Sequence, residues 1–232
     1  MARTRVEEAP PLKAQKQKPH EYTVTYVPVK QALRSIYFSR KEIKHLAIGA
    51  LLVMGAGLSL ALYPNVYREA NEPIMIVMFT VILTGSFFIH EIAHKIAAQK
   101  RGLWAEFRLT LMGAVLTLFS VVSAYFKIIS PGAVMIGGFA DKEKIGRISI
   151  AGPATNIVLS GILLALSLVP VQGAWVFLYG ATFNAWIAVF NLIPFGILDG
   201  FKIFAWNSKI WALAFAASLA IMFLSFLLQI YL

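Results

Sequence analysis

Residues 90–94 read His-Glu-Ile-Ala-His, a spacing that suits metal-assisted chemistry. In a helix, residues i and i+4 project from nearly the same face about 6 Å apart, so His90 and His94 can bind one metal ion. The intervening Glu91 can then act as general base on a water molecule that the metal activates. The alternative is a hydrogen-bonded histidine pair in a polar bundle interior. Ionisable residues within an apolar span are costly, however, and usually functional.

A catalytic zinc site usually takes three protein ligands and leaves a fourth position for water. The other histidines, His20 and His45, lie in or beside the N-terminal segment, outside this span. Asp141 lies beside lysines in a loop and is a solvated charge, whereas Asp199 follows a long apolar run. An isolated carboxylate there needs a metal or a cation as partner. We expect Asp199 to be the third ligand, and an ion pair with Lys202 at the membrane edge is the alternative.

Two asparagines lie within predicted apolar runs. Asn156 ends the block Gly-Pro-Ala-Thr-Asn at 152–156, and Asn191 precedes Pro194 by three residues. Buried amides in lipid must find partners. They can join helices to one another, or they can hold an unwound substrate backbone or a developing oxyanion. The residues alone leave both roles open.

The composition is that of a membrane protein: the 232 residues are 59% hydrophobic, only 14% charged, and include no cysteine. This excludes a disordered chain, a disulfide-stabilised secreted domain and a cysteine-ligated metal site. Apolar runs close to the roughly 20 residues that a helix needs to cross a bilayer occur at 46–63, 74–98, 148–169, 174–193 and from 210 to the C-terminus. We therefore predict an all-α multi-span membrane protein with about five transmembrane helices.

Residues 1–44 are polar and basic and lack the apolar core of a signal peptide. We expect a cytosolic tail there, with weak alternation at 21–29 that suits a short strand, followed by a membrane-embedded domain at 45–232. The net charge of +10 could indicate nucleic-acid binding. In multi-span membrane proteins, however, Lys and Arg gather on the cytoplasmic side. We interpret the charge as topology and expect the lipid bilayer, and no nucleic acid, as partner.

The apolar stretch 109–129 either crosses the membrane or enters it and returns to the same side. If it spans, the basic residues that follow it face outward, namely Lys127, Lys142, Lys144 and Arg147. The positive-inside rule favours its return. Its Val, Thr and Leu content suits strand-like backbone. We predict a strand-like re-entrant element within 109–137, which also puts Asp199 at the same membrane side as the two histidines.

Three blocks in this order resemble the site-2 protease family of intramembrane zinc metalloproteases: residues 90–94, residues 152–156, and Asn-Leu-Ile-Pro-Phe-Gly-Ile-Leu-Asp-Gly at 191–200. The resemblance extends over residues 74 to 205, approximately. The resemblance implies one zinc ion per chain, with three ligands, a catalytic base and two positioning residues. By this resemblance, the zinc ligands would be His90, His94 and Asp199, and the catalytic base would be Glu91. Asn191 and Asn156 would position substrate or stabilise the oxyanion.

The resemblance also implies hydrolysis of peptide bonds within, or at the edge of, the transmembrane helices of single-pass substrate proteins. The site would lie within a prokaryotic cell membrane toward the cytosol, on the same side as the N-terminus. Gly196 stands where many members have a second proline. Segment 99–147 is too short for the PDZ domain that many bacterial members insert, and we expect no CBS domain after the last span.

Two other function classes remain open on the sequence. A prenyl-protein-processing metalloprotease also uses His-Glu-x-x-His but takes a downstream glutamate as third ligand, here Glu106 or Glu143. A metal- or proton-handling transporter or scaffold would bind its ion at the same histidines without protease activity.

Overall fold

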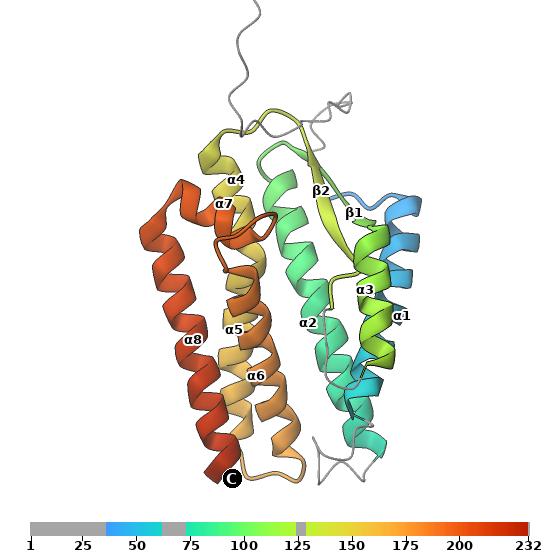
Figure 1. Cartoon of the computed structure of the whole chain (residues 1–232), viewed down its shortest axis with the longest axis vertical. Helices are drawn as coiled ribbons and strands as arrows, with labels where there is room; N and C mark the ends of the chain where they lie inside the picture. The colour runs from blue at the N-terminus through green and yellow to red at the C-terminus, as the bar shows by residue number, and fades with distance from the viewer. Residues whose placement is uncertain (1–35, 62–72, 124–128, 232) are drawn as a thin grey trace, which may run out of the picture.

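The computed structural model describes residues 36–61, 73–123 and 129–231 (Figure 1). The possible strand at 21–29, most of the basic tail and Lys127 lie outside the described residues.

Long helices form a bundle that is covered at one end by a two-stranded sheet and two short helices (Figure 1). The long helices are α1 (Arg40–Ala61), α2 (Pro73–Gln99), α5 (Ala151–Ser167), α6 (Ala174–Asn191) and α8 (Ser208–Tyr231). The short ones at the covered end are α4 (Lys142–Ser149) and α7 (Asp199–Trp206). The predicted multi-span, mostly helical fold is confirmed.

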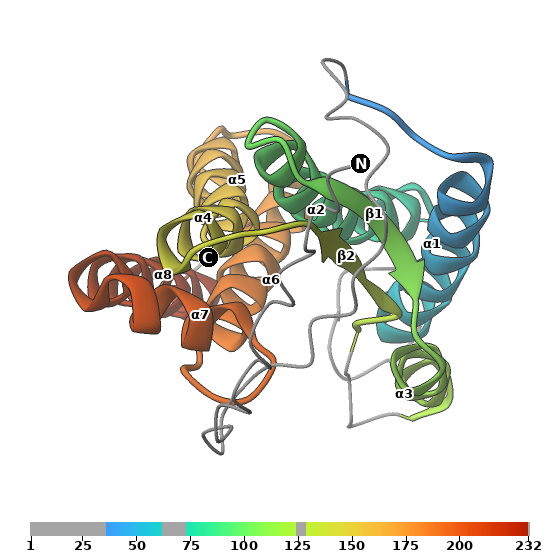
Figure 2. The same ribbon diagram turned by 90° about the horizontal axis from the view of Figure 1, so that it is seen from above.

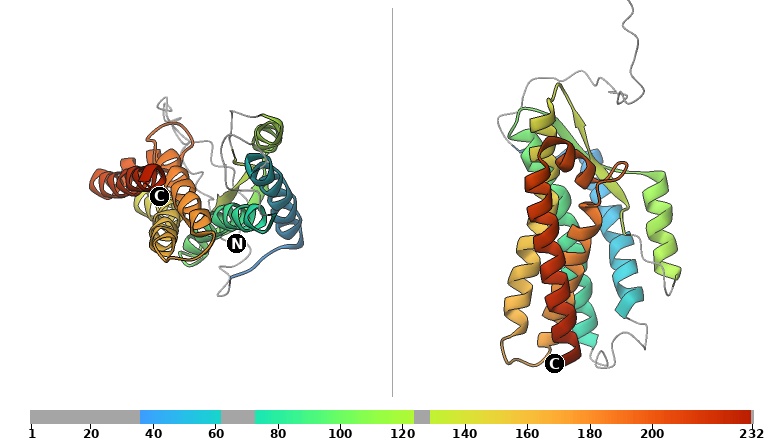
Figure 3. Two further views of the ribbon diagram at one scale, coloured as in Figure 1. Left: turned by 90° about the horizontal axis from the view of Figure 1, so that it is seen from below. Right: turned by 60° about the vertical axis from the view of Figure 1, so that its left-hand side comes forward.

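Within the described residues, four helical segments are long and apolar enough to cross a membrane. They are Arg40–Ser59, Pro73–Gln99, Lys142–Ser167, which joins α4 to α5, and Ser208–Tyr231. The remaining predicted run, 174–193, corresponds to α6, which carries Asn184 and Asn191 and is not one of the four. It nevertheless packs against α5 and α8 in the bundle (Figure 3).

Helix α1 begins earlier than the predicted boundary at residue 45. Ser39 Oγ accepts a hydrogen bond from the Glu42 backbone N–H at 3.1 Å, which is one half of a capping box with glutamate at the third helical position. This cap starts the helix at Arg40, so the last residues of the predicted tail are helical.

Strands β1 (Trp104–Leu109) and β2 (Gly132–Gly137) pair antiparallel, with Leu109 opposite Gly132. The segment between them therefore returns to the end from which it started, as predicted. The strand-like element predicted within 109–137 is present as β2, whereas Leu111–Val122 forms helix α3. The Thr110 side chain caps α3 by accepting from the Gly113 N–H at 3.2 Å, and that cap was not recognised in the sequence.

The outer edge of β1 is held by polar side chains of α1 and α2. Glu42 Oε1 accepts from the Phe107 N–H at 2.9 Å, and Glu42 Oε2 pairs with Lys95 Nζ at 2.6 Å. His45 Nδ1 accepts from the Leu109 N–H at 3.1 Å. The sheet lies between α1 and α3 on one side and α4 and α7 on the other (Figure 2). Because side chains of α1 and α2 occupy the outer side of β1, the edge open to a further strand among the described residues is that of β2.

Candidate active site

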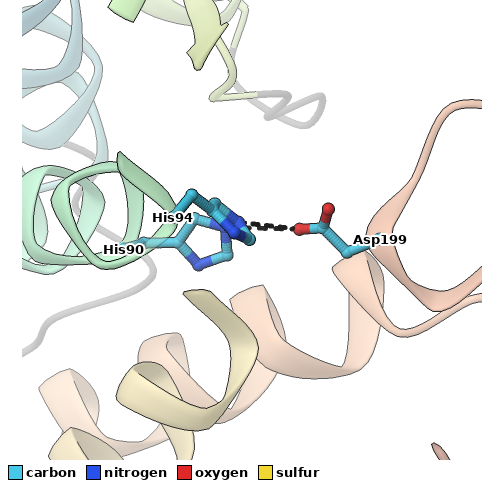
Figure 4. Close-up of side chains that lie close together, drawn as sticks. All are labelled: His90, His94 and Asp199. Carbon is cyan, nitrogen blue, oxygen red and sulfur yellow. Dashed lines mark hydrogen bonds and ion pairs between the residues drawn. The ribbon is translucent and has the colours of Figure 1, made fainter. Parts of the chain in front are cut away.

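His90 and His94 lie one turn apart on the last part of α2 and point toward Asp199, the first residue of α7 (Figure 4). His94 Nε2 is 2.9 Å from Asp199 Oδ2 and 3.1 Å from His90 Nε2. His90 Nε2 is 3.8 Å from the same Asp199 oxygen. The structure thus brings together three of the residues selected from the sequence, although Asp199 comes from a distant part of the chain.

These three ligand atoms fit a zinc ion. A tetrahedral zinc with bonds of about 2.0–2.1 Å holds its ligand atoms about 3.3–3.4 Å apart. The three observed separations scatter around that value, between 2.9 and 3.8 Å. A neutral imidazole pair with one carboxylate is also a ligand set that zinc accepts in catalytic sites.

Gly152 of α5 leaves room beside the two imidazoles. A side chain there would meet the Nε2 atoms of both His90 and His94, the atoms that face Asp199. A glycine at this position therefore allows the α5 backbone to approach the ligand atoms closely. This explains on physical grounds why the block at 152–156 belongs to the site.

The far nitrogen of each ring has a hydrogen-bond acceptor. His90 Nδ1 donates to Asn156 Oδ1 at 2.5 Å, and His94 Nδ1 donates to the Ile148 carbonyl oxygen at 2.9 Å. With the protons on Nδ1, both Nε2 lone pairs are directed toward the metal position. Such outer contacts fix the tautomer and orientation of metal-binding histidines.

Asp199 is positioned by the turn that joins α6 to α7. Gly200 allows close approach to the Leu192 carbonyl oxygen, which also accepts from Trp211 Nε1 at 2.7 Å. Gly196 has φ +60°, which a proline cannot adopt, so this turn differs from a form with a second proline.

The Asp199 carboxylate uses its two oxygens differently. Oδ2 faces the histidines, whereas Oδ1 is 3.4 Å from Lys202 Nζ, so the ion pair considered as an alternative coexists with the histidine contacts. The Lys202 ammonium favours the ionised carboxylate, which is the form that binds a metal.

Glu91 lies on α2 between the two histidines and is 8% exposed. The backbone of Val134 in β2 is its hydrogen-bond partner. The glutamate thus lies between the metal position and the free edge of the sheet. Within the described residues, Glu91 forms no ion pair with a lysine or arginine, which leaves its carboxylate available for proton transfer.

The two predicted asparagines occupy different settings. Asn156 is fully buried and touches His90, as described above. Asn191 is half-buried on the last turn of α6, where its Nδ2 donates to the Ile187 carbonyl oxygen at 2.9 Å. The structure joins Asn156 directly to a candidate ligand and gives Asn191 a contact within its own helix.

Other acidic residues that entered the sequence analysis lie in ion pairs or caps away from the cluster. Glu106 pairs with Arg108, and Glu143 pairs with Arg147. Asp141 caps α4 by accepting from the Lys144 N–H. Among the described residues, the third member of the candidate metal site is therefore an aspartate. Neither of the two glutamates that the prenyl-processing alternative could use belongs to this site.

Sequence reasoning missed Asn184 and Ser86. Asn184 Oδ1 accepts from Asn156 Nδ2 at 2.9 Å, and Asn184 Nδ2 donates to Ser86 Oγ at 2.8 Å. A signal was present in each case: Asn184 is an amide in the middle of an apolar run, and Ser86 lies one turn before His90 on the same helix face.

A bundle of apolar helices with a His-His-Asp cluster and an adjoining glutamate is the arrangement expected of a membrane metalloenzyme. No family model and no solved structure matches the chain. Among curated proteins, it is 34% identical over 181 residues to the "Putative zinc metalloprotease MJ0611" of Methanocaldococcus jannaschii, covering 76% of this chain and 90% of that protein. It is also 32% identical over 130 residues to the "Putative zinc metalloprotease Rip3" of Mycobacterium tuberculosis, covering 52% of this chain and 28% of that protein.

The extent of the first match shows the family. The chain belongs to the site-2 protease family of zinc metalloproteases.

Proposed function

We propose that this chain is an intramembrane zinc metalloendopeptidase that hydrolyses peptide bonds within, or at the edge of, the transmembrane helices of single-pass substrate proteins. The observation that carries the proposal is the convergence of His90, His94 and Asp199, with Glu91 beside them, at one end of a bundle of apolar helices. A buried cluster of this kind in an apolar bundle is expensive and is best explained by function.

In this proposal, one zinc ion per chain is held by His90, His94 and Asp199. When bound, zinc supplies Lewis-acid polarisation of the scissile carbonyl and activation of a water molecule. Glu91 acts as the general base and then as the general acid. It takes a proton from the attacking water and delivers it to the nitrogen of the leaving amine, so that one C–N bond breaks as one C–O bond forms.

The two asparagines act beside this centre. Asn191, on the final turn of α6, positions the substrate backbone or stabilises the oxyanion, because its Nδ2 retains one hydrogen beyond the bond to Ile187. Asn156 acts through His90, since its carbonyl oxygen accepts from that ring. Neither role requires a charged residue to be brought into the apolar bundle.

The free edge of β2 is the proposed place for an unwound substrate segment. Phe107 and Leu109 direct their N–H groups outward to α1, so their partners on β2, Val134 and Gly132, also point their backbone groups away from β1. Ile136 follows the same alternation. An extended peptide can add a strand at this edge by β-augmentation, next to Glu91.

A substitution at Ile136 tests the strand-addition step. Proline is tolerated at a strand edge but removes the outward N–H, so Ile136→Pro is expected to abolish cleavage while zinc remains bound. Ile136→Ala keeps the N–H and is the matched control. Unchanged cleavage by the proline variant would contradict β-augmentation at β2.

Orientation follows from charge. Lys142, Lys144 and Arg147 lie on α4 at the same end of the bundle as the candidate site. By the positive-inside rule this end faces the cytosol, so the site opens toward the cytosolic side of a prokaryotic cell membrane. Reaction of single cysteines introduced at residues 142 and 231 with an impermeant thiol reagent in sealed vesicles checks this orientation, because the natural chain has no cysteine.

The decisive experiment uses proteoliposomes that contain the purified chain and a single-pass test substrate. Glu91→Gln is expected to retain about one zinc per chain and to lower the cleavage rate by about 10²–10⁴-fold, the usual contribution of a general base. Glu143→Gln is the matched control, because the Glu143 side chain is 60% exposed in a surface ion pair. This variant should cleave the substrate at the wild-type rate.

The same variant separates the protease from the transporter or scaffold alternative. Ion transport across proteoliposomes that survives Glu91→Gln, together with no cleavage by the wild-type chain, would favour the alternative. Loss of cleavage with zinc retained favours the protease.

A further inference from the structure

We propose that Asn184 is a positioning residue for the metal ligand His90, acting through Asn156 and supported by Ser86. The inference rests on the proposed zinc site and assigns to it a residue that lies two side chains away from the metal position. It starts from a continuous chain of hydrogen bonds. The chain begins at His90, passes through Asn156 and Asn184, and ends at Ser86, one turn before His90 on α2.

A carbonyl oxygen of the α6 backbone fixes which atom donates and which accepts in each of these hydrogen bonds. Asn184 Nδ2 donates to the Gly180 carbonyl oxygen at 2.9 Å, and a carbonyl can only accept. The Asn184 amide must therefore direct its Oδ1 toward Asn156. Asn156 in turn must present Nδ2 to Asn184 and Oδ1 to His90.

The consequence reaches the metal position. Because Asn156 presents an acceptor, His90 must carry its proton on Nδ1, and the lone pair of Nε2 is left for a metal ion. If the Asn156 amide turned over, it would present a donor to Nδ1 and favour the tautomer whose Nε2 is protonated. Asn184 prevents that rotation, since two facing N–H groups or two facing oxygens would leave buried polar atoms without partners.

Burial makes this orientation strict. Asn156 and Asn184 are fully buried, and Ser86 is 3% exposed, so water does not offer substitute partners. Ser86 Oγ accepts from Asn184 and donates to the Ile82 carbonyl oxygen at 2.6 Å. The hydrogen bonds of Asn156, Asn184 and Ser86 thus all agree with the arrangement that directs His90 toward Asp199.

The test measures zinc affinity by competition with a chromophoric chelator, using the full chain in detergent. Asn184→Leu removes the hydrogen bonds at similar side-chain size and is expected to weaken zinc binding about 10–100-fold, as loss of an outer hydrogen bond to a metal ligand typically does. The matched control is Ser160→Ala. Ser160 is also fully buried and links α5 to α6, through a bond from Oγ to the Ala181 carbonyl oxygen, but it is not joined to His90.

A milder variant keeps the test decisive if Asn184→Leu does not fold. Ser86→Ala removes only the far end of the set and is expected to weaken zinc binding less than Asn184→Leu but more than Ser160→Ala. Zinc affinities of both variants equal to that of Ser160→Ala would overturn the proposal.

A second readout reports the ring itself. Nitrogen-15 NMR of histidine-labelled, metal-free protein is expected to show the Nδ1-protonated form of His90 in the wild type and a mixture of tautomers in Asn184→Leu. An unchanged tautomer would overturn the proposal even if stability fell. Both readouts are independent of cleavage, so a chain that binds zinc in this Asn184-dependent way but cleaves no substrate refutes the protease proposal and supports this inference.

Discussion

Gly152→Ala is the sharpest single test of the metal position, because the added methyl group points at the proposed ligand atoms. A Cβ at this residue would lie 2.6 Å from His90 Nε2, and closer still to His94 Nε2. Ordinary van der Waals contact begins at 3.4 Å, so the ring of His90 and the α5 backbone must separate by at least about 0.8 Å.

That displacement is larger than the site can absorb. Zinc–ligand distances are held to within about 0.2 Å in a well-formed site. A misplacement of about 1 Å in a functional site costs about 10²-fold. We therefore expect zinc binding to Gly152→Ala to be at least about 100-fold weaker, which corresponds to about 2.7 kcal/mol.

The assay is chelator competition on detergent-purified protein, with thermal unfolding of the metal-free chain measured in parallel. Gly161→Ala on the same helix is the matched control, because a Cβ there meets nothing within 4 Å. It should bind zinc as the wild type does. A folded Gly152→Ala chain with zinc affinity within about threefold of the wild type would refute the assignment of the metal position.

Three further results are expected. Asp199→Asn should lose most of its zinc by elemental analysis while remaining folded, because a neutral amide replaces the carboxylate ligand; zinc at about one per chain would remove Asp199 from the ligand set. Glu42→Leu should lower the free energy of unfolding by about 3–5 kcal/mol because it strands a buried Lys95, whereas the double variant with Lys95→Met should recover most of that loss; additive losses in detergent unfolding would contradict a buried ion pair. Trp211→Phe should weaken zinc binding by less than Asp199→Asn, because it removes the indole N–H that holds the Leu192 carbonyl oxygen beside the Asp199 turn but leaves the carboxylate ligand in place. Zinc binding equal to the wild type would show that this bond does not position the turn.

The sequence by itself determined the local chemistry. Two histidines at i and i+4 on an apolar helix share a face because of helical periodicity, and no tertiary contact is needed to infer this. The apolar runs fixed the membrane class, since their length matches the bilayer. Charge bias also predicted that the chain returns after 109–129, and the pairing of Leu109 with Gly132 agrees.

Short polar caps set two helix starts that the sequence analysis did not identify. Composition suggested strand for 109–129, but the Thr110 cap starts a helix there and moves the strands to either side. The Ser39 cap likewise starts α1 inside the predicted tail. Both are single hydrogen bonds of about 1 kcal/mol, too small to stand out against the propensity of a whole segment.

Only the tertiary structure decided which distant groups meet. The approach of Asp199 to His94 depends on how α6, its following turn and α7 pack against α2, and the role of Gly152 depends on the distance between α5 and two imidazoles. The partners of Asn156 depend in the same way on three helices meeting at one level. Sequence determines which side chains can bind a metal or accept a hydrogen bond, whereas the packing of helices far apart in the chain determines which of them do.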